Sequence, residues 1–325
     1  MRKSIAIIGA GIAGLSCAAT LRDAGHHVVV FDKGRGLGGR LCTRRGEGWQ
    51  ADHGAQYFTA RHPLFQQQVQ NWLGNGSVAI WQAHPAVLGS SQVPAHDAPV
   101  RYLGVPGMSA PAKALAAGLE VHTSHTIQGL IHAADGWRLS NAEHGQLSGI
   151  HSQVVVALPS PQAASLLAQA SPSLSTLAAA HRMLPCWTVM AQLEEPAQLG
   201  FEAAFVNSGP LRWLARNNSK PGRSGQECWV LQANAHWSAA HLEDDAASVK
   251  QALLMAFEQL GGPPAVASSA HRWRYADCEA SNLGSVWDAT LGIGLCGDWL
   301  HGGKVEGAWL SGHHLANKIL EREQG

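Results

Sequence analysis

The chain has 325 residues, room for one large or two modest cores, and 46% of them are hydrophobic, as in an ordinary globular protein. Lys and Arg total 23, as do Asp and Glu, without a run of like charge, which argues against a nucleic-acid surface or a polybasic membrane patch. The six cysteines form no C-x-x-C pair and no metal-like spacing, so we expect reduced thiols, a cytoplasmic location and no bound metal. A small-molecule partner is therefore expected.

The start of the chain predicts a strand, a glycine turn and a helix. An apolar, β-branched run, Ser4 to Ile8, leads directly into a G-x-G-x-x-G pattern, and a helix-compatible stretch follows up to Gly25. In such a turn Gly9 permits the tight bend, Gly11 lets the backbone approach a diphosphate, and Gly14 lets the helix lie close to the strand.

Neither a cleaved leader nor a membrane span is expected. Residues 1–20 superficially resemble a signal peptide, but cleavage there would remove a glycine fingerprint that the rest of the chain explains better. No window reaches the roughly 18 to 20 uninterrupted apolar residues of a spanning helix.

A second strand and a second glycine turn follow. His27 to Phe31 reads as a strand that ends at Asp32, where an acidic side chain would accept hydrogen bonds from ribose hydroxyls. The next residues, 32–40, read D-K-G-R-G-L-G-G-R. This segment gives a second backbone approach to a diphosphate, and Arg40 could hold that group or pin the loop. Two glycine turns in one unit favour FAD over a nicotinamide cofactor. The alternative interpretation of residues 32–40 is a flexible basic loop.

The end of the chain repeats the strand, loop and helix pattern. Leu291 to Cys296 is a short apolar strand that runs into Gly297-Asp298-Trp299, and a glycine-containing segment then precedes a helix through Leu320. In two-dinucleotide-type flavoproteins an Asp at this place meets the ribityl chain, and the helix N-terminus faces the flavin pyrimidine ring. An amphipathic helix packed on the sheet is a compatible interpretation. We therefore expect the two ends of the chain to build one FAD site.

The middle of the chain supplies the remaining elements. Buried-strand patterns or a strand pair are predicted over 121–131, 136–140 and 151–158, and a helix over 161–170. Trp-rich alternating runs, 186–193 and 228–233, predict strands of a second sheet. We expect an α/β fold in which a discontinuous Rossmann-type FAD-binding domain covers residues 1–61, 101–160 and 285–325, and an α+β substrate domain covers residues 62–100 and 161–284.

Several stretches resemble the bacterial renalase family over essentially the whole chain. They include G-A-Q-Y-F-T-A-R, ending at Arg61, and V-E-G-A-W-L-S-G, ending at Gly312, which are far more specific than the glycine fingerprint, and also 106–108, 213–217 and 271–273. The resemblance implies a fold of the hydroxybenzoate hydroxylase and monoamine oxidase group with non-covalent FAD. It also implies an oxidase that takes hydride from the 2- and 6-dihydro isomers of NAD(P)H, returns β-NAD(P)+ and reduces O2 to hydrogen peroxide.

The resemblance also implies site residues. It implies FAD contacts for Gly9, Gly11, Ile12, Ala13, Gly14, Asp32, Lys33, Gly38, Gly39, Arg40, Gln56, Tyr57, Ile127, Gly297, Asp298, Val305, Glu306 and Ala308. It implies the substrate side of the flavin for Tyr57, Phe58, Thr59, Ala60, Arg61, His96, Met183 and Trp187. No catalytic side chain is assigned, because flavin N5 would accept the hydride.

The chemistry of the two possible substrates makes different demands. A dihydronicotinamide becomes an aromatic pyridinium when it loses hydride, so it needs no base, only aromatic walls that hold its ring about 3 to 3.5 Å from flavin N5. An amine must be neutral first, and His62, His236 or Lys304 could then be proposed as a base, none of them uniquely. Cys296 is expected to pack as a small apolar residue rather than to attach the flavin. An amine oxidase and a non-catalytic flavoprotein remain as alternatives, and the protein is expected to be a monomer or a dimer.

Overall fold

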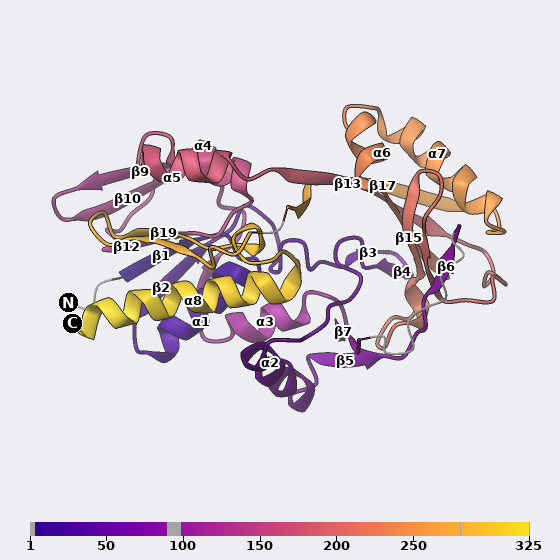
Figure 1. The fold of residues 1–325 in the computed structure, drawn as a ribbon, viewed down its shortest axis with the longest axis horizontal. Helices are drawn as coiled ribbons and strands as arrows, with labels where there is room; N and C mark the ends of the chain where they lie inside the picture. Colours follow the sequence, from indigo (N-terminus) through magenta and orange to yellow (C-terminus); the bar gives the residue numbers. More distant parts are fainter. Residues whose placement is uncertain (1–3, 90–98, 280, 325) are drawn as a thin grey trace.

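The computed structural model describes residues 4–89, 99–279 and 281–324, which form two lobes (Figure 1). A six-stranded sheet lies at the centre of the first lobe, in the order β18-β19-β12-β1-β2-β8. Five of its strands are parallel: β1 (Ser4–Ile8), β2 (His27–Phe31), β8 (Glu120–His122), β12 (Gln153–Val156) and β19 (Ile293–Leu295). The edge strand β18 (Val286–Asp288) is antiparallel. The inner strands are buried on both faces, which explains their continuous apolar sequences.

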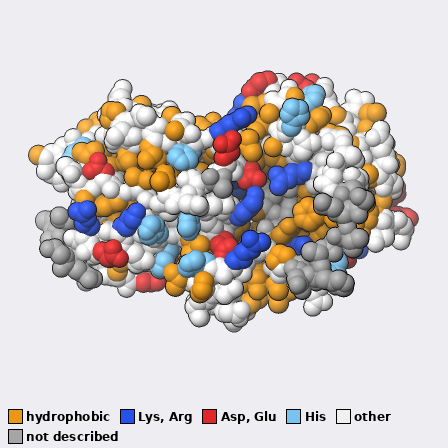
Figure 2. Space-filling model, viewed as in Figure 1, with side chains coloured by type: hydrophobic (Ala, Val, Ile, Leu, Met, Phe, Trp, Pro, Cys, Tyr) orange, Lys and Arg blue, Asp and Glu red, His pale blue; other side chains and the backbone are white. Residues whose placement is uncertain are grey.

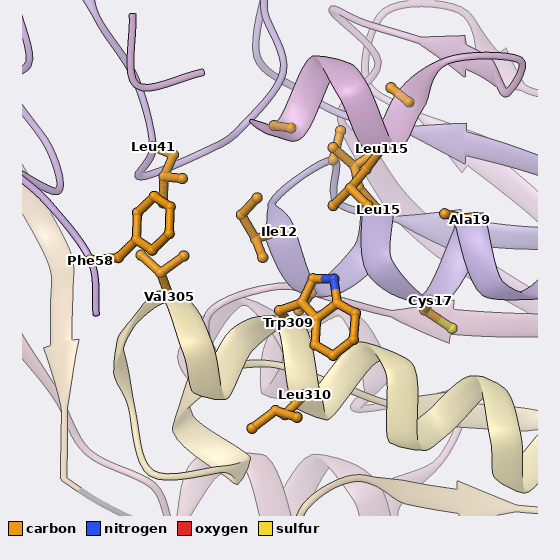
Figure 3. Packing of buried hydrophobic residues seen from close by; sticks show 14 of the residues in the cluster. Ile12, Leu15, Cys17, Ala19, Leu41, Phe58, Leu115, Val305, Trp309 and Leu310 are labelled. Atoms are coloured by element: carbon orange, nitrogen blue, oxygen red, sulfur yellow. The ribbon is translucent and has the colours of Figure 1, made fainter. Parts of the chain in front are cut away.

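Helices α1 (Ile12–Asp23) and α8 (Lys304–Gln324) lie side by side on one face of this sheet (Figure 1). A Cβ on Gly312 would lie 2.0 Å from the Ala13 carbonyl oxygen, so only glycine allows this approach. The Ser16 hydroxyl donates to the Trp309 carbonyl at 2.8 Å. Figure 3 shows Ile12 and Leu15 facing Trp309 across the two helices. The same core includes α3 (Ala110–Ala116) and α2 (Pro63–Gly74).

The opposite face of the sheet is covered by a hairpin and two short helices. The hairpin sheet contains β9 (Ile127–Ala133), β10 (Gly136–Asn141) and β11 (Gly145–Gln146). The helices are α4 (Ser160–Leu167) and α5 (Pro172–Ala179). Their apolar side chains form a second core with Val154, Trp137 and Trp299.

A second six-stranded sheet builds the other lobe. Its order is β17-β13-β16-β15-β14-β6, with β17 (Ala267–Cys278), β13 (Met183–Gln192), β16 (Cys228–Ala233), β15 (Leu211–Arg216), β14 (Ala203–Val206) and β6 (Ala86–Leu88). Helices α6 (Ala235–Ala240) and α7 (Ala246–Gln259) pack on it. The one-turn 3-10 helices are η1 (Asn217–Ser219), after β15, and η2 (Asp298–Leu300), after β19. Two small ribbons, β3 (Arg44–Gly46) with β4 (Trp49–Ala51) and β5 (Val78–Trp81) with β7 (Arg101–Gly104), lie between the lobes.

Three expectations about the elements are corrected. The predicted strand 121–131 is two strands, because β8 joins the parallel sheet and β9 starts the hairpin. Helix α2, expected in the substrate domain, packs with the first lobe, where Phe65 and Trp72 share a core with α1. Helices α4 and α5, also expected in the substrate domain, cover the first sheet. None of the described helices is long and apolar enough to cross a membrane.

Candidate functional site

A cleft of about 2030 Å³ runs between the two lobes. Segments from both ends and from the middle of the chain line it, including residues 38–41, 54–59, 125–128, 270–277 and 301–308. Single small-molecule sites usually measure about 300–1,000 Å³, so this cleft has room for a large cofactor and a second molecule.

The first glycine turn forms one wall of the cleft. Gly9 has a φ of +111°, and a Cβ there would lie 2.5 Å from the Ala157 carbonyl oxygen. A Cβ on Gly11 would meet nothing within 4 Å, and Gly11 lines the cleft. Helix α1 begins here with no side-chain cap and no acidic residue in its first turn. Its first N–H groups are therefore suited to a diphosphate.

The second glycine turn lies against the first. Gly38 and Gly11 form a parallel β-bridge, and the Gly38 N–H donates to the Ala10 carbonyl at 2.9 Å. The Asp32 carboxylate accepts from the N–H groups of Ala10 and Gly34, both at 2.6 Å. Asp32 thus holds the two turns together while also lining the cleft. This backbone cradle fits the diphosphate of FAD.

Arg40 joins the two ends of the chain. Its Nη1 and Nη2 donate to Asp298 Oδ2 and Oδ1 at 2.9 and 2.7 Å, a bidentate pair between residues 258 positions apart. Burial alone would lower the Arg40 pKa, but the Asp298 carboxylate raises it above its usual value. Asp298 is 5% exposed, so the guanidinium supplies the charge partner that a buried carboxylate needs.

The start of helix α8 forms the wall next to Asp298. Residues 302 and 303 are glycines with φ of +67° and +73°, which bring the chain into the helix, and Val305 and Ala308 line the cleft. Glu306 also lines it, but its Oε1 accepts from the backbone N–H groups of Arg61 and His62 at 2.8 and 2.6 Å. The carboxylate therefore holds the 54–62 segment in place, a role that the sequence did not predict.

A buried ionic cluster lies behind Gln56. The Asp52 carboxylate contacts Lys220 Nζ at 3.2 Å and Arg223 Nη2 at 2.8 Å, and all three side chains are fully buried. Lys220 Nζ also donates to Gln56 Oε1 at 3.1 Å, and Gln56 lines the cleft. Burial would raise the Asp52 pKa, but the two cations hold it below its usual value, whereas burial lowers the Lys220 pKa. Nothing in the sequence indicated that Lys220 is buried and holds Gln56 in place.

Aromatic rings gather on the second lobe's side of the cleft. The Tyr57 ring lies 5.5 Å from that of Trp213, with the Arg101 guanidinium 5.2 Å over it, and Phe205 lies 4.8 Å from Trp213. Trp187 also lines the cleft, with its Nε1 donating to the His241 carbonyl at 2.8 Å. These flat side chains can hold a planar ring by stacking.

His271 and Trp273 of β17 line the cleft nearby, although the sequence assigned neither a role there. The His53 ring stacks on Trp273 at 5.3 Å and meets the His271 ring edge-on at 4.9 Å. Burial, then the charge of Arg44, lower the His271 pKa, so this imidazole is neutral in the cleft. Burial, then His271, lower the pKa of His53 to about 4. The alternation of His271 and Trp273 on a strand was the signal that could have assigned them to one face.

Most of the residues expected at the site line the cleft. They are Gly9, Gly11, Ile12, Ala13, Asp32, Lys33, Gly38, Gly39, Arg40, Gln56, Tyr57, Phe58, Thr59, Arg61, Ile127, Trp187, Gly297, Asp298, Val305, Glu306 and Ala308. Their contacts with FAD stay predictions.

Three expected residues do not line the cleft. Gly14 faces the Gly9 carbonyl oxygen, where a Cβ would approach to 2.0 Å, so its role is packing. Ala60 packs against the core of the first lobe. Met183 is buried at the start of β13, paired with Cys278. His96 lies outside the described residues.

Of the side chains considered as bases or attachment points, two have other partners. His62 caps α2 by accepting from the Leu64 N–H at 3.3 Å, and the Lys304 ammonium pairs with Asp277 at 3.1 Å. His236 lies on α6 and does not line the cleft. Cys296 is a buried free thiol, and burial raises its pKa to about 12. Among the described residues, no three His, Cys, Asp or Glu side chains could together hold a metal ion.

Two glycine turns, an uncapped helix and an Arg–Asp pair across one cleft define a flavin-dependent oxidoreductase with a Rossmann-type nucleotide lobe. Residues 7–72 match the family model of an NAD(P)-binding Rossmann-like domain, and residues 96–320 match that of flavin containing amine oxidoreductase. The chain therefore belongs to the flavin-containing amine oxidoreductase family, and its cofactor is FAD.

Known relatives share the fold or the nucleotide-binding segment. An L-amino-acid oxidase from Siganus canaliculatus is 44% identical over 64 residues, which are 19% of this chain and 12% of that protein. The chain thus matches only a small part of this relative's length. Cyclohexylamine oxidase from Brevibacterium oxydans has a TM-score of 0.75 at 12% identity, with 100% of both chains covered. Putrescine oxidase bound to putrescine has a TM-score of 0.72 at 14% identity, with 99% of each chain covered. At these identities the structures show a common fold.

Proposed function

We propose that this protein oxidises the 2- and 6-dihydro isomers of NAD(P)H to β-NAD(P)+, as its resemblance to bacterial renalases implies. FAD bound in the cleft would supply the two-electron acceptor, taking hydride from the substrate and passing the electrons to O2, which yields hydrogen peroxide. The residues proposed to hold FAD are the two glycine turns, Asp32, the Arg40–Asp298 pair and the first turn of α8.

The observation that carries the proposal is the aromatic wall opposite these residues. Tyr57, Trp213 and Phe205 surround a part of the cleft with flat rings, and Trp273, on the same face of the second sheet as Trp213, extends it. Stacking would orient a planar dihydronicotinamide, and the rings would exclude water from the reacting carbon. Loss of hydride makes that ring aromatic, so no side chain has to remove a proton.

Two neighbouring arginines at the cleft support a phosphate-bearing substrate. Arg61, Arg212, Arg272, Arg274 and Lys304 all line it. Acidic side chains line the cleft as well, and they lie among the basic ones between the two lobes (Figure 2). Asp277 pairs with Arg212 and Lys304, and Glu243 pairs with Arg272 and Arg274. The support therefore comes from Arg272 and Arg274, whose neighbouring guanidinium groups could contact one phosphate together. Trp187 lies beneath Arg272, whose guanidinium is 5.5 Å from the ring centre, so an aromatic and a cationic side chain are in contact at the cleft.

Amine oxidation is the second candidate, and one observation favours it. His271 lines the cleft with its pKa lowered by burial, so near neutral pH it is a free base that could accept the proton of an ammonium substrate. The family and the amine-oxidising proteins of the same fold agree with this possibility.

Anaerobic mixing distinguishes the two candidates. The FAD-loaded protein is mixed with 6-dihydro-NAD, and the flavin absorbance is followed while β-NAD+ is measured in the quenched mixture. The expected result is rapid loss of the absorbance with stoichiometric β-NAD+. Ordinary β-NADH is the matched control, because its hydride is at a different ring carbon. Bleaching by putrescine or cyclohexylamine, with none by 6-dihydro-NAD, would replace the proposal with amine oxidation. If no compound bleaches the flavin, a non-catalytic role is favoured.

A further inference from the structure

Strand β17 presents two arginines to the cleft. Arg272 and Arg274 are two residues apart on the strand and both line the cleft. Side chains at this spacing leave the same face of a strand, and Trp273 between them is turned to the other face, where its Nε1 donates to the His53 carbonyl at 2.8 Å. Arg272 Nη1 donates to the Leu242 carbonyl at 2.6 Å, and its guanidinium lies 5.5 Å over the Trp187 ring. The Arg272 donors are thus fixed in direction.

One carboxylate bridges the two arginines. Glu243 Oε2 accepts from Arg272 Nη1 at 3.1 Å and from Arg274 Nη2 at 2.8 Å, while Oε1 accepts from Arg274 Nη1 at 2.6 Å. Glu243 lies in the turn between α6 and α7, and its side chain is 70% exposed. An exposed ion pair contributes little to stability, so this carboxylate can leave at small cost.

The neighbouring acids have other partners. Asp244 Oδ2 pairs with His241 Nδ1 at 2.7 Å. The Asp245 carboxylate caps α7, accepting from the N–H groups of Ala247 and Ser248 at 2.9 and 3.0 Å. Glu243 is therefore the carboxylate that occupies the space between the two guanidinium groups.

A phosphate fits this space better than a carboxylate. It carries more negative charge and more acceptor oxygens, and two guanidinium groups can contact it at once. The diphosphate of FAD already has a place at the uncapped start of α1 and the two glycine turns, so the arginines are free for a second ligand.

We infer that Arg272 and Arg274 bind a phosphate or diphosphate group of the substrate, and that Glu243 holds the two side chains in position until that group displaces it. The inference rests on the proposed function, because an NAD-type substrate carries such a diphosphate. The aromatic wall, which lines the same cleft, would receive the nicotinamide ring.

The test is a calorimetric titration of the FAD-loaded protein with ADP-ribose, which has the diphosphate but no oxidisable ring. We expect Arg274→Met, and independently Arg272→Met, to weaken binding by about tenfold or more, as for loss of a hydrogen bond to a charged group. Glu243→Gln should tighten binding severalfold, because the competing charge is gone. Arg138→Met is the matched control: Arg138 forms the same kind of exposed pair with Asp135, away from the cleft, and its loss should change nothing.

The outcomes separate this inference from the proposed function. Failure of ADP-ribose to bind the wild-type protein, or equal affinity in the arginine variants, would overturn the phosphate site even if 6-dihydro-NAD bleaches the flavin. Conversely, if ADP-ribose binding depends on both arginines while 6-dihydro-NAD leaves the flavin oxidised, the phosphate site stands and the proposed reaction is wrong. The affinity for adenosine, which lacks phosphate, should be the same in all four variants as in the wild-type protein.

Discussion

Arg40 and Asp298 bring the amino-terminal and carboxy-terminal segments together through one bidentate ion pair. The sequence indicated each residue separately, Arg40 as a loop or diphosphate contact and Asp298 as a ribityl contact. It could not indicate that the two side chains pair, because no local sequence pattern connects residues 258 positions apart. Asp32 is similar: its place after β2 was predictable, whereas its hydrogen bonds to the Ala10 and Gly34 N–H groups depend on how the two turns meet.

Replacement of Arg40 by methionine should weaken FAD binding by about tenfold or more, because it leaves the buried Asp298 carboxylate unpaired beside the cofactor. The dissociation constant is measured by titrating flavin-depleted protein with FAD. Arg35→Met is the control, since Arg35 is exposed in the same loop and does not line the cleft. An Arg40→Met protein that binds FAD as tightly as wild type would show that the pair has no part in the site.

His53 predicts a pH dependence of stability. Its folded-state pKa is about 4, lowered by burial and then by His271, while an unfolded histidine titrates near pH 6.5. The unfolded chain therefore binds more protons between these values, and stability is lost as the pH falls through this window. From pH 7 to pH 5 the contribution of His53 should fall by about 2 kcal/mol. Urea unfolding of wild type and His53→Gln at both pH values measures it; an equal loss in both proteins would contradict this assignment.

At the scale of elements, the contact between α1 and α8 determines how the two ends approach the cleft. The helices were predictable from their glycine boundaries and apolar spacing, but their direct contact depends on Gly312, whose closest neighbours are backbone atoms of Ala13 and Cys17. The helix predicted over 161–170 is present as α4, but the assignment of α2, α4 and α5 to the substrate domain differs from their packing, for a related reason. Amphipathic helices reveal that one face is buried, but not which sheet buries it.

A methyl group on Gly312 should therefore destabilise the protein. Gly312→Ala would bring Cβ to 2.0 Å from the Ala13 carbonyl oxygen, and the helices would have to separate, at a cost of about 1–3 kcal/mol. Gly74→Ala is the matched control on α2, because a Cβ there meets nothing within 4 Å and alanine favours helix. Thermal unfolding measures both. Equal stability of the Gly312→Ala and wild-type proteins would contradict the packing described.

At the scale of the whole molecule, the two lobes meet at the cluster of Asp52, Lys220 and Arg223. Asp52 precedes the cleft-lining segment 54–59, while the two cations lie in the connection between β15 and β16. The sequence predicted two domains and the convergence of the chain ends. It did not predict this joint, because a lysine or arginine in a Pro-Gly-rich stretch has the composition of an exposed loop.

Breaking this joint should lower the free energy of unfolding by more than the loss of an exposed ion pair does. Asp52→Asn leaves two buried cations without their carboxylate, and the expected loss is about 3–5 kcal/mol in the free energy of unfolding. Asp135→Asn, which removes an exposed pair with Arg138, should change the free energy of unfolding far less, because water screens that pair. Urea unfolding gives both values, and similar losses for the two variants would mean that the cluster does not join the lobes energetically.

The central claim is that segments at opposite ends of the chain build one non-covalent FAD site, and flavin content measures it most directly. Purified protein is heat-denatured, and the released flavin is separated and quantified. We expect about one FAD per chain, all of it released, and little or none in Gly11→Val, whose branched side chain would enter the cleft at the proposed diphosphate position. Wild-type protein that is colourless, and takes up no FAD from solution, would contradict the central claim.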